Sequence, residues 1–459
     1  MKSILPLLVI LLLILPVASS PYLTINKSPG NSAEEGGGRN TFCSGGWGPE
    51  DEGDHFPCGR EWWNVDAFFE IEGMGNWSLT SSFEYEMETP ACNLFLTVFD
   101  MDTGTHYNLG SYGDPIGTLA YEKNRVNLTY YDSWMKGLYP SYAVHFERKN
   151  FVINLHYDAV TPPKFVADEI SGGVLPMGLG YYVYGFIPLC RVTGNITVDN
   201  KTAELHGSGY YEHVWGNWTY SNPLRNPSNL KNVSSAYIDL MKWWLFHHKL
   251  SVPSTIAFSS DNNMFGYDWI WASFDNGWSM FYGNMPSWVC KGPAFGIFYL
   301  VSDDGQYITF SNISYEYGDM VYVKEYDVYY PSEIKIIARE GEREMSLQFR
   351  MVCDVHTYLD TNLSSIYWRA IFLWESPGYV SGYYSDGNNN ITLSGRCEIE
   401  PERQVSVMGH NYIGFNFTSP PDGIGMEISI ISHFFNIGLD ILFQVLPVPR
   451  FHFSFKILP

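Results

Sequence analysis

The chain has 459 residues, of which 45% are hydrophobic and only 17% are charged, so it has enough apolar material for a sizeable core and bulk disorder is excluded. Acidic residues outnumber basic ones by 49 to 27, and the net charge of −22 excludes nucleic acid as a partner, because a phosphate-binding surface needs the opposite sign. Aromatic residues make up 17% of the chain, which favours strands and apolar ligands over helical bundles.

The first twenty residues have the pattern of a secretory signal peptide. Lys2 precedes an apolar run from Ile4 to Val17, and the small residues Ala18, Ser19 and Ser20 follow. Residues 1–20 are therefore predicted to direct export, and the alternative is an uncleaved membrane anchor. Either way we expect an extracytoplasmic protein, secreted or membrane-anchored. Eleven N-x-S/T sequons predict N-glycosylation, at Asn26, Asn76, Asn127, Asn195, Asn200, Asn217, Asn232, Asn312, Asn362, Asn390 and Asn416.

Residues 21–55 are rich in Gly, Ser, Asn and Glu, which predicts a linker or mobile arm. The chain has seven cysteines and no C-x-x-C motif, so redox and zinc-ribbon motifs are absent. In an oxidising compartment Cys43 and Cys58 could close a small loop at the entrance to the folded region.

From about residue 56 the chain consists of short runs rich in Tyr, Trp, Phe, Val, Ile and Thr that alternate between apolar and polar residues. This pattern is typical of half-buried antiparallel strands. Hairpin turns are predicted at 102–104, 275–277, 303–305 and 386–387, where Asp or Asn precedes Gly. Residues 234–250 form the one helix-like stretch, although a strand or connector is an alternative. The prediction is an all-β protein, a sandwich or barrel, divided into regions 56–240 and 250–420.

The tail, residues 421–459, is apolar but contains polar residues such as His433, Asn436 and Asp440. A membrane-spanning helix tolerates such groups poorly. Packed domain structure, an amphipathic surface helix and a spanning helix all remain open, and so does association with a membrane surface.

General catalytic motifs are absent: there is no G-x-S-x-G, no H-E-x-x-H and no P-loop. Four other segments are distinctive, and they are Glu61-Trp62-Trp63, the run Pro188 to Gly194, the run Gly209 to Gly216, and the run Gly266 to Gly277. A later element runs from Gly395 to Glu400.

In this order the segments resemble the AttH-like family, which includes carotenoid 1,2-hydratase (hydroxyneurosporene synthase) and lipocalin-like pericyclases. The resemblance covers roughly residues 55 to 400 and implies two lipocalin-like antiparallel β-barrel domains. The chain departs from the family pattern at Asn64, Glu212 and Tyr267, where the family has Tyr, Asp and Trp, so its substrate can differ. In hydratase members a His-x-Trp pair, with a Tyr and an Asp, is associated with activity, and His213 and Trp215 match that spacing.

Hydration of an isoprenoid double bond needs an acid to protonate the alkene and aromatic faces to stabilise the cation. His213, Asp268 and Glu212 are the candidate catalytic residues. Candidate substrate-binding residues are Trp215, Tyr210, Tyr267, Trp269, Trp271 and Trp63. Three of these candidates and two neighbouring residues also have structural interpretations: His213 as a hydrogen-bonded core residue, Asp268 as a cap of strand-end amides, Trp62 and Trp63 as packing at the barrel floor, and Glu61 as a buried partner of Arg60 or Arg191.

The leading hypothesis is thus an exported AttH-like enzyme that hydrates, isomerises or cyclises a hydrophobic isoprenoid, carotenoid or lipid, with no metal or organic cofactor. A non-catalytic lipocalin-like carrier of lipid or isoprenoid is the alternative, and a structural surface role is a third. Carotenoid hydratases are not generally secreted, so the export signal argues against copying that exact activity.

Overall fold

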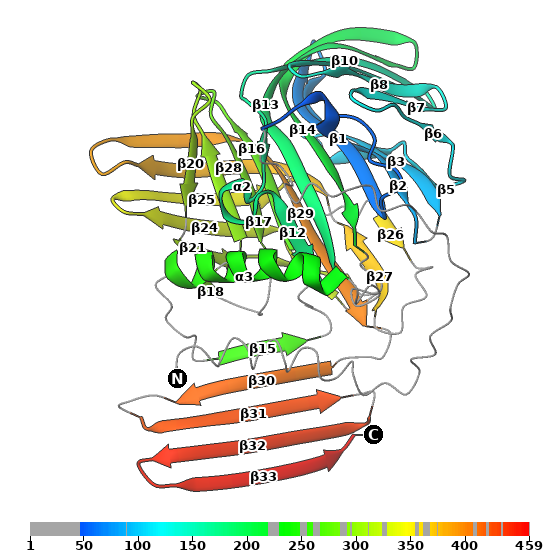
Figure 1. The fold of residues 1–459 in the computed structure, drawn as a ribbon. Coiled ribbons are helices and arrows are strands. Elements are labelled where there is room, and N and C mark those ends of the chain that lie inside the picture. Colours follow the sequence, from blue (N-terminus) through cyan, green and yellow to red (C-terminus); the bar gives the residue numbers. More distant parts are fainter. Residues whose placement is uncertain are drawn as a thin grey trace. The chain divides into compact units, whose positions relative to one another are not determined.

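The computed structural model describes residues 46–88, 90–218, 229–247, 255–259, 267–284, 292–293, 296–310, 312–323, 328–353, 358–360, 368–373, 375–406, 411–418, 422–432 and 435–458. Within these ranges the chain is nearly all β, and two large antiparallel sheets form a half-barrel and a nearly closed barrel (Figure 1). The predicted all-β fold with two barrel domains is confirmed.

The first sheet has the order β4-β3-β2-β1-β14-β13-β10-β9-β8-β7-β6, with β5, β11 and β12 attached beside it. Its core is the apolar, inward-facing set of alternate residues, including Trp63, Phe83 and Tyr157. The strands are β1 Arg60–Ile71, β2 Gly75–Glu86, β3 Ala91–Asp100, β4 Thr105–Asn108, β5 Ser111–Asp114, β6 Leu119–Ala120, β7 Val126–Tyr130, β8 Ser133–Leu138, β9 Ser141–Arg148, β10 Phe151–Ala159, β11 Lys164–Phe165, β12 Val174–Met177, β13 Gly180–Val198 and β14 Lys201–Asn217.

The second sheet has the order β18-β21-β24-β25-β28-β29-β16-β17-β19-β20, and β27 pairs with β26 and β29. Its own core includes Ile270, Phe298 and Phe349. The strands are β16 Tyr267–Phe274, β17 Ser279–Asn284, β18 Gly292–Pro293, β19 Gly296–Val301, β20 Tyr307–Phe310, β21 Asn312–Tyr317, β24 Glu333–Glu340, β25 Arg343–Met351, β26 Tyr358–Asp360, β27 Trp368–Leu373, β28 Ser376–Ser385 and β29 Asn390–Ser406. A separate ribbon pairs β22 Met320–Val323 with β23 Val328–Pro331.

The tail forms a sheet of its own with the order β15-β30-β31-β32-β33. Its strands are β15 Thr255–Ser259, β30 Asn411–Thr418, β31 Ile424–Ser432, β32 Ile437–Leu446 and β33 Arg450–Ile457. The described part of the tail is therefore strand and not helix. β15 and β30, which lie inside the region predicted as the second barrel, pair with the tail strands instead. Alternate residues of the edge strand β33 leave three phenylalanines exposed, Phe451, Phe453 and Phe455.

The predicted turns and the helix are present. The four Asp/Asn-Gly segments join β3 to β4, β16 to β17, β19 to β20 and β28 to β29. Gly104 and Gly277 have φ of 72° and 84°, a left-handed conformation that favours glycine. Helix α3 spans Leu230–His247, and a short α2 spans Asp168–Ser171. Among the described residues, no helix combines the length and hydropathy needed to cross a bilayer.

Residues 46–55 differ from the mobile arm that their composition predicts. A 3₁₀ helix at Pro49–Asp51 leads into Glu52, which is completely buried, and its carbonyl accepts a hydrogen bond from Trp63 Nε1 at 3.1 Å. This segment therefore packs against the first barrel. Cys58 has a buried free thiol, so the suggested closure of a loop with Cys43 gains no support, and Cys43 itself lies outside the described residues.

The two large sheets meet along an aromatic seam. Phe68 of β1 stacks on Trp271 of β16 with ring centroids 4.6 Å apart, and Trp271 Nε1 donates to the Pro188 carbonyl at 2.9 Å. Tyr299 OH accepts a hydrogen bond from the Ala167 amide at 3.1 Å. Because β14 contacts β16 at this seam, side chains on the outer face of the first sheet meet those of the second.

Candidate functional site

Strand β14 distributes the predicted site residues over two faces because side chains alternate along a strand. His213 and Trp215 point into the first barrel. Trp215 and Trp63 belong to the core of this barrel, and the His213 ring stacks on Trp63. Tyr210 and Glu212 point the other way, into the seam between the sheets. The pairing predicted for His213 with Trp215 is thus present, with ring centroids 4.7 Å apart.

The predicted site residues of strand β16 are likewise divided between its two faces. Tyr267, Trp269 and Trp271 face the seam, where Tyr210 lies 5.4 Å from Trp269 and 5.5 Å from Trp271 between ring centroids. Asp268 occupies the opposite face, is buried in the second barrel, and accepts a short hydrogen bond from Tyr317 OH. The three predicted acids therefore lie in three separate environments, and the structure brings only Glu212 together with the seam aromatics.

The carboxylate of Glu212 is held by side chains from three neighbouring strands. Trp62 Nε1 and Asn64 Nδ2 of β1 donate to Oε1 at 2.8 and 2.6 Å. Tyr210 OH of β14 donates to Oε2 at 2.8 Å, and Tyr184 OH of β13 makes a shorter hydrogen bond to the same oxygen. Asn64 lies directly opposite Glu212 in the β1–β14 register, so two of the three departures from the family pattern contact each other.

Glu212 is only 3% exposed. Burial raises its pKa from 4.5 to about 7; the hydrogen bonds from Tyr184, Trp62 and Tyr210 oppose this rise, and the charge of Glu375 adds to it. A carboxyl with this pKa can hold a proton at neutral pH and release it to a substrate.

Further carboxyls face the same seam. Glu398, Glu400 and Glu402 of β29 lie opposite Trp271, Trp269 and Tyr267 in the β16–β29 register, and Tyr267 OH donates to Glu400 Oε1 at 2.6 Å. Burial, reinforced by neighbouring carboxylates, raises the pKa values of Glu398 and Glu400 well above their ordinary range.

From the first sheet, Asp66 and Thr80 complete this acidic region. Thr80 Oγ1 donates to Glu375 Oε2 at 2.8 Å, and the amide of Ser81 donates to Asp66 Oδ1 at 3.1 Å. Burial and the charge of Glu398 raise the pKa of Asp66 well above its usual value. The seam therefore combines aromatic rings with several carboxyls whose raised pKa values favour the protonated form.

Polar atoms at the seam also lack protein partners. Within the described residues, Asn64 Oδ1, Trp269 Nε1 and Glu398 Oε2 are buried and have no hydrogen-bond partner. Such atoms cost free energy unless water or a ligand satisfies them. Their position beside Glu212 and Tyr210 makes the seam the best candidate for a functional site.

His213 belongs to a different cluster inside the first barrel. It is fully buried, its ring stacks on Trp63 at 4.5 Å, and its Nδ1 donates to the Asp51 carbonyl at 2.7 Å. Its Nε2 lies 2.9 Å from Glu61 Oε1, which His55 Nδ1 also contacts at 2.9 Å. Both polar atoms of the His213 ring are therefore engaged within the protein.

The structure corrects the interpretation of Glu61. Its expected partner Arg60 instead pairs with Glu86 and Glu84, while Glu61 pairs with His213 and His55. Burial alone would raise the pKa of Glu61, but the hydrogen bonds from the two histidines outweigh it and hold the pKa at about 2.

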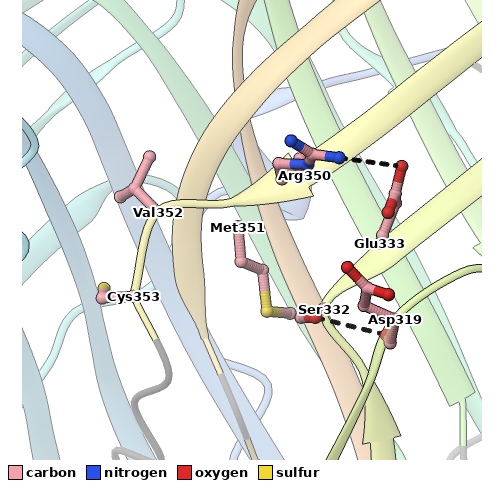
Figure 2. A pocket seen from close by; sticks show the side chains of 7 residues that line it. All are labelled: Asp319, Ser332, Glu333, Arg350, Met351, Val352 and Cys353. Atoms are coloured by element: carbon pink, nitrogen blue, oxygen red, sulfur yellow. Dashed lines mark hydrogen bonds and ion pairs between the residues drawn. The ribbon is translucent and has the colours of Figure 1, made fainter.

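A polar pocket of about 320 Å³ lies apart from these residues (Figure 2). Its labelled lining includes one ion pair, in which Arg350 Nη2 lies 3.4 Å from Glu333 Oε1, and Ser332 Oγ donates to the Asp319 carbonyl at 3.2 Å. None of the predicted site residues lines it, and its lining lacks the combination of acid and aromatic rings that the predicted chemistry needs.

Comparison with solved structures identifies the architecture. A candidate AttH from Nitrosomonas europaea matches with a TM-score of 0.50 and 16% identity, over 81% of this chain and 98% of that one. The chain shares the AttH fold. Kievitone hydratase from Nectria haematococca matches with a TM-score of 0.47 and 11% identity over 77% and 91% of the two chains. CghA, in a structure with Sch210972, matches with a TM-score of 0.46 and 12% identity over 76% of this chain and 89% of that one. No protein-family model and no curated protein matches the sequence.

Several seam residues were not predicted from the sequence. The alternation Glu398-Ile399-Glu400-Pro401-Glu402 could have indicated a row of acids on one strand face, because side chains two apart share a face. Asn64 and Trp62 could have been linked to Glu212 only through the register of β1 with β14. Glu375 has no comparable signal, since its contact Thr80 lies 295 residues away in the sequence.

The raised pKa of Glu212 predicts a pH-dependent stability. The folded state binds this proton more tightly than the unfolded state, so its contribution is full below pH 4.5 and is lost as pH rises to about 7. We expect the loss to be about 3 kcal/mol of unfolding free energy. Urea denaturation at pH 5 and pH 8 should show a drop that is larger in the wild type than in Glu212→Gln by about this amount, because the other seam carboxyls with raised pKa values contribute to both proteins. The same pH dependence in both proteins would contradict this prediction. The control is Glu204→Gln, which replaces an exposed glutamate on the same strand.

Proposed function

We propose that the protein is an exported enzyme that performs acid-initiated hydration, isomerisation or cyclisation of a hydrophobic isoprenoid or lipid. The observation that carries this proposal is the Glu212 carboxyl, buried between two sheets with a pKa near 7 and surrounded by Tyr and Trp rings. His213 is the weaker candidate because it lies inside the first barrel, on the face of β14 opposite the seam rings of Tyr210, Trp269 and Trp271, where Asp51 and Glu61 hold its ring.

The reaction begins with protonated Glu212. Its O–H transfers the proton to one alkene carbon, and the π pair of the double bond forms the new C–H bond. The other carbon becomes a cation, which the ring faces of Tyr210, Trp269 and Trp271 stabilise. The carboxylate left behind is stabilised by the donors that already converge on it, from Trp62, Asn64, Tyr184 and Tyr210.

The cation can then react in three ways, and each of them returns a proton to the Glu212 carboxylate. In hydration, a water oxygen adds to the cation and loses a proton to the Glu212 carboxylate, so the net change is addition of one water. In isomerisation, the cation loses a neighbouring proton to the same carboxylate. In cyclisation, a second double bond of the substrate attacks the cation before that proton is lost. None of these steps requires a metal or organic cofactor.

The unpartnered seam atoms support a role in positioning water. Trp269 Nε1 can donate to a water oxygen, and Glu398 Oε2 lies on the same sheet face at the neighbouring strand. A water held there would satisfy buried atoms that otherwise lack partners. Hydration is therefore the outcome that the seam supports best.

Export to an extracytoplasmic location and N-glycosylation are part of the proposal. Their support is the apolar run Ile4 to Val17 and the eleven sequons, of which Asn200, Asn390 and Asn416 are exposed. Association with a membrane surface stays a prediction.

The proposal is tested by mass spectrometry of an organic extract of the protein from its native host. We expect an apolar isoprenoid or lipid, and incubation of that compound in water enriched in ¹⁸O should yield a product heavier by one labelled water. Stoichiometric ligand without any product would instead establish the carrier, which the same aromatic seam could serve. An empty extract, together with failure to take up an apolar probe, would contradict both.

The pH dependence of turnover gives a separate test. Because the acid form of Glu212 starts the reaction, we expect kcat/KM for the extracted compound to fall as pH rises through about 7, with the slope of a single ionisation. Stopped assays from pH 5 to pH 9 would measure it. A rate that increases through this range would contradict a Glu212 acid, since it would require a base at the same pKa.

A further inference from the structure

The side chains of His55, Glu61 and His213 bring three potential metal ligands close together. His213 Nε2 and His55 Nδ1 each lie 2.9 Å from Glu61 Oε1, and the His55 amide lies 3.0 Å from the same oxygen. The amide is shared with Oε2 at 3.1 Å, so the two imidazole nitrogens account for both in-plane lone pairs of Oε1. All three ligand atoms lie within 4.8 Å of one another.

The hydrogen bond at the far side of His213 decides which nitrogen carries a proton. The Asp51 carbonyl can only accept, so Nδ1 at 2.7 Å must carry the hydrogen. In the neutral ring, Nε2 then has its lone pair directed at Glu61 Oε1. Two acceptors facing each other at 2.9 Å need a proton, on the ring as in the hydrogen bond described above or on the carboxyl, or else a cation between them.

A metal ion fits this cluster once the two imidazole rings adjust. Zn²⁺ binds His nitrogen and carboxylate oxygen at about 2.0–2.2 Å, so tetrahedral ligands lie roughly 3.3 Å apart. The two N–O separations of 2.9 Å would open by about 0.4 Å, and the two imidazole nitrogens, which lie within 4.8 Å of each other, would take up the same spacing.

The surroundings have the features that support a bound metal. Metal-ligating histidines usually donate their other N–H to a carbonyl or carboxylate, as His213 does to Asp51. The second oxygen of Glu61 accepts from Tyr85 OH at 2.5 Å, which orients the carboxylate. Trp63 stacks on His213 and Trp215 stacks on His55 at 4.0 Å, so both rings are held in place.

Access is available on one side. The side chain of His55 is 24% exposed, whereas those of Glu61 and His213 are completely buried. An ion can therefore reach the cluster past His55, while the two buried ligands keep it from open solvent.

We infer that His55, Glu61 and His213 form a binding site for a divalent transition-metal ion of the Zn²⁺ class, with a fourth position left to water or a small ligand. Two imidazoles and one carboxylate favour zinc or a similar metal over Ca²⁺ and Mg²⁺, which prefer oxygen ligands. The site is separate from the proposed reaction, because it lies on the opposite face of β14 from Glu212.

The test uses Co²⁺ as a spectroscopic probe. The full protein is treated with EDTA, dialysed and titrated with Co²⁺, and we expect one equivalent to produce visible d–d absorption, and added Zn²⁺ to displace it and raise Tm. Elemental analysis of untreated protein should then find about one equivalent of a transition metal. No absorption and no change in Tm would overturn the inference.

Variants separate this site from surface binding. His55→Ala, which removes the partly exposed ligand, should weaken Co²⁺ binding by more than about tenfold. His156→Ala is the matched control, because His156 lies in an exposed pair with Asp158 at 3.2 Å and should leave binding unchanged. Equal binding in wild type and His55→Ala would overturn the inference. Glu212→Gln should bind Co²⁺ normally, so loss of turnover there would not count against the metal site.

Discussion

Replacement of Glu212 by Gln is expected to lower turnover of the extracted compound by about 10²–10⁴-fold, the usual contribution of a general acid. Gln is close in shape and keeps a carbonyl oxygen that can accept from Trp62 and Asn64, so the seam should stay assembled. It has no acidic proton for an alkene. The measurement is the initial rate of product formation at pH 6, where the wild-type carboxyl is mostly protonated.

The control for this variant is Glu204→Gln, on the same strand but exposed, which should retain wild-type turnover. Circular dichroism and Tm should show that both variants are folded. Wild-type turnover in folded Glu212→Gln would exclude Glu212 as the acid. Substrate that still binds this variant at full stoichiometry, without product, would support the assignment by separating binding from chemistry.

Replacement of His213 by Ala is expected to lower the free energy of unfolding by about 3–5 kcal/mol, because it leaves a buried carboxylate without one of its partners. Glu61 would keep His55 and Tyr85, but it would lose the contact at 2.9 Å, and Trp63 would lose the ring stacked on it. The Asp51 carbonyl would also lose its donor. Urea denaturation monitored by Trp fluorescence would measure the change.

The comparison should use EDTA-treated protein, so that the loss reports the protein contacts and not a bound metal. His156→Ala should change the free energy of unfolding by no more than about 0.5 kcal/mol, since that side chain is on the surface. An equally small effect of His213→Ala would show that the buried cluster does not stabilise the barrel.

Much of the fold could be predicted because its signals are local. Alternation of apolar and polar residues predicts strands, and Asp or Asn before Gly predicts the hairpins that join β3 to β4 and β16 to β17. Alternation along a strand also predicts that the neighbours Glu212 and His213 face opposite ways, as they do in the structure. The start of the ordered region was less predictable, because residues 46–55 look like a linker by composition and are held by contacts with distant strands.

Local patterns in the sequence establish an all-β, acidic and aromatic-rich chain, and they indicate which residues of each strand share a face. Which of these faces pack against each other depends on the tertiary structure. It placed Glu212 against Trp269 and Trp271, moved Asp268 into the second barrel, and joined Glu61 to His213 and His55 instead of Arg60. The reason is physical: side-chain alternation is set by the local backbone, whereas strand register and the packing of one sheet on another depend on residues far apart in the chain.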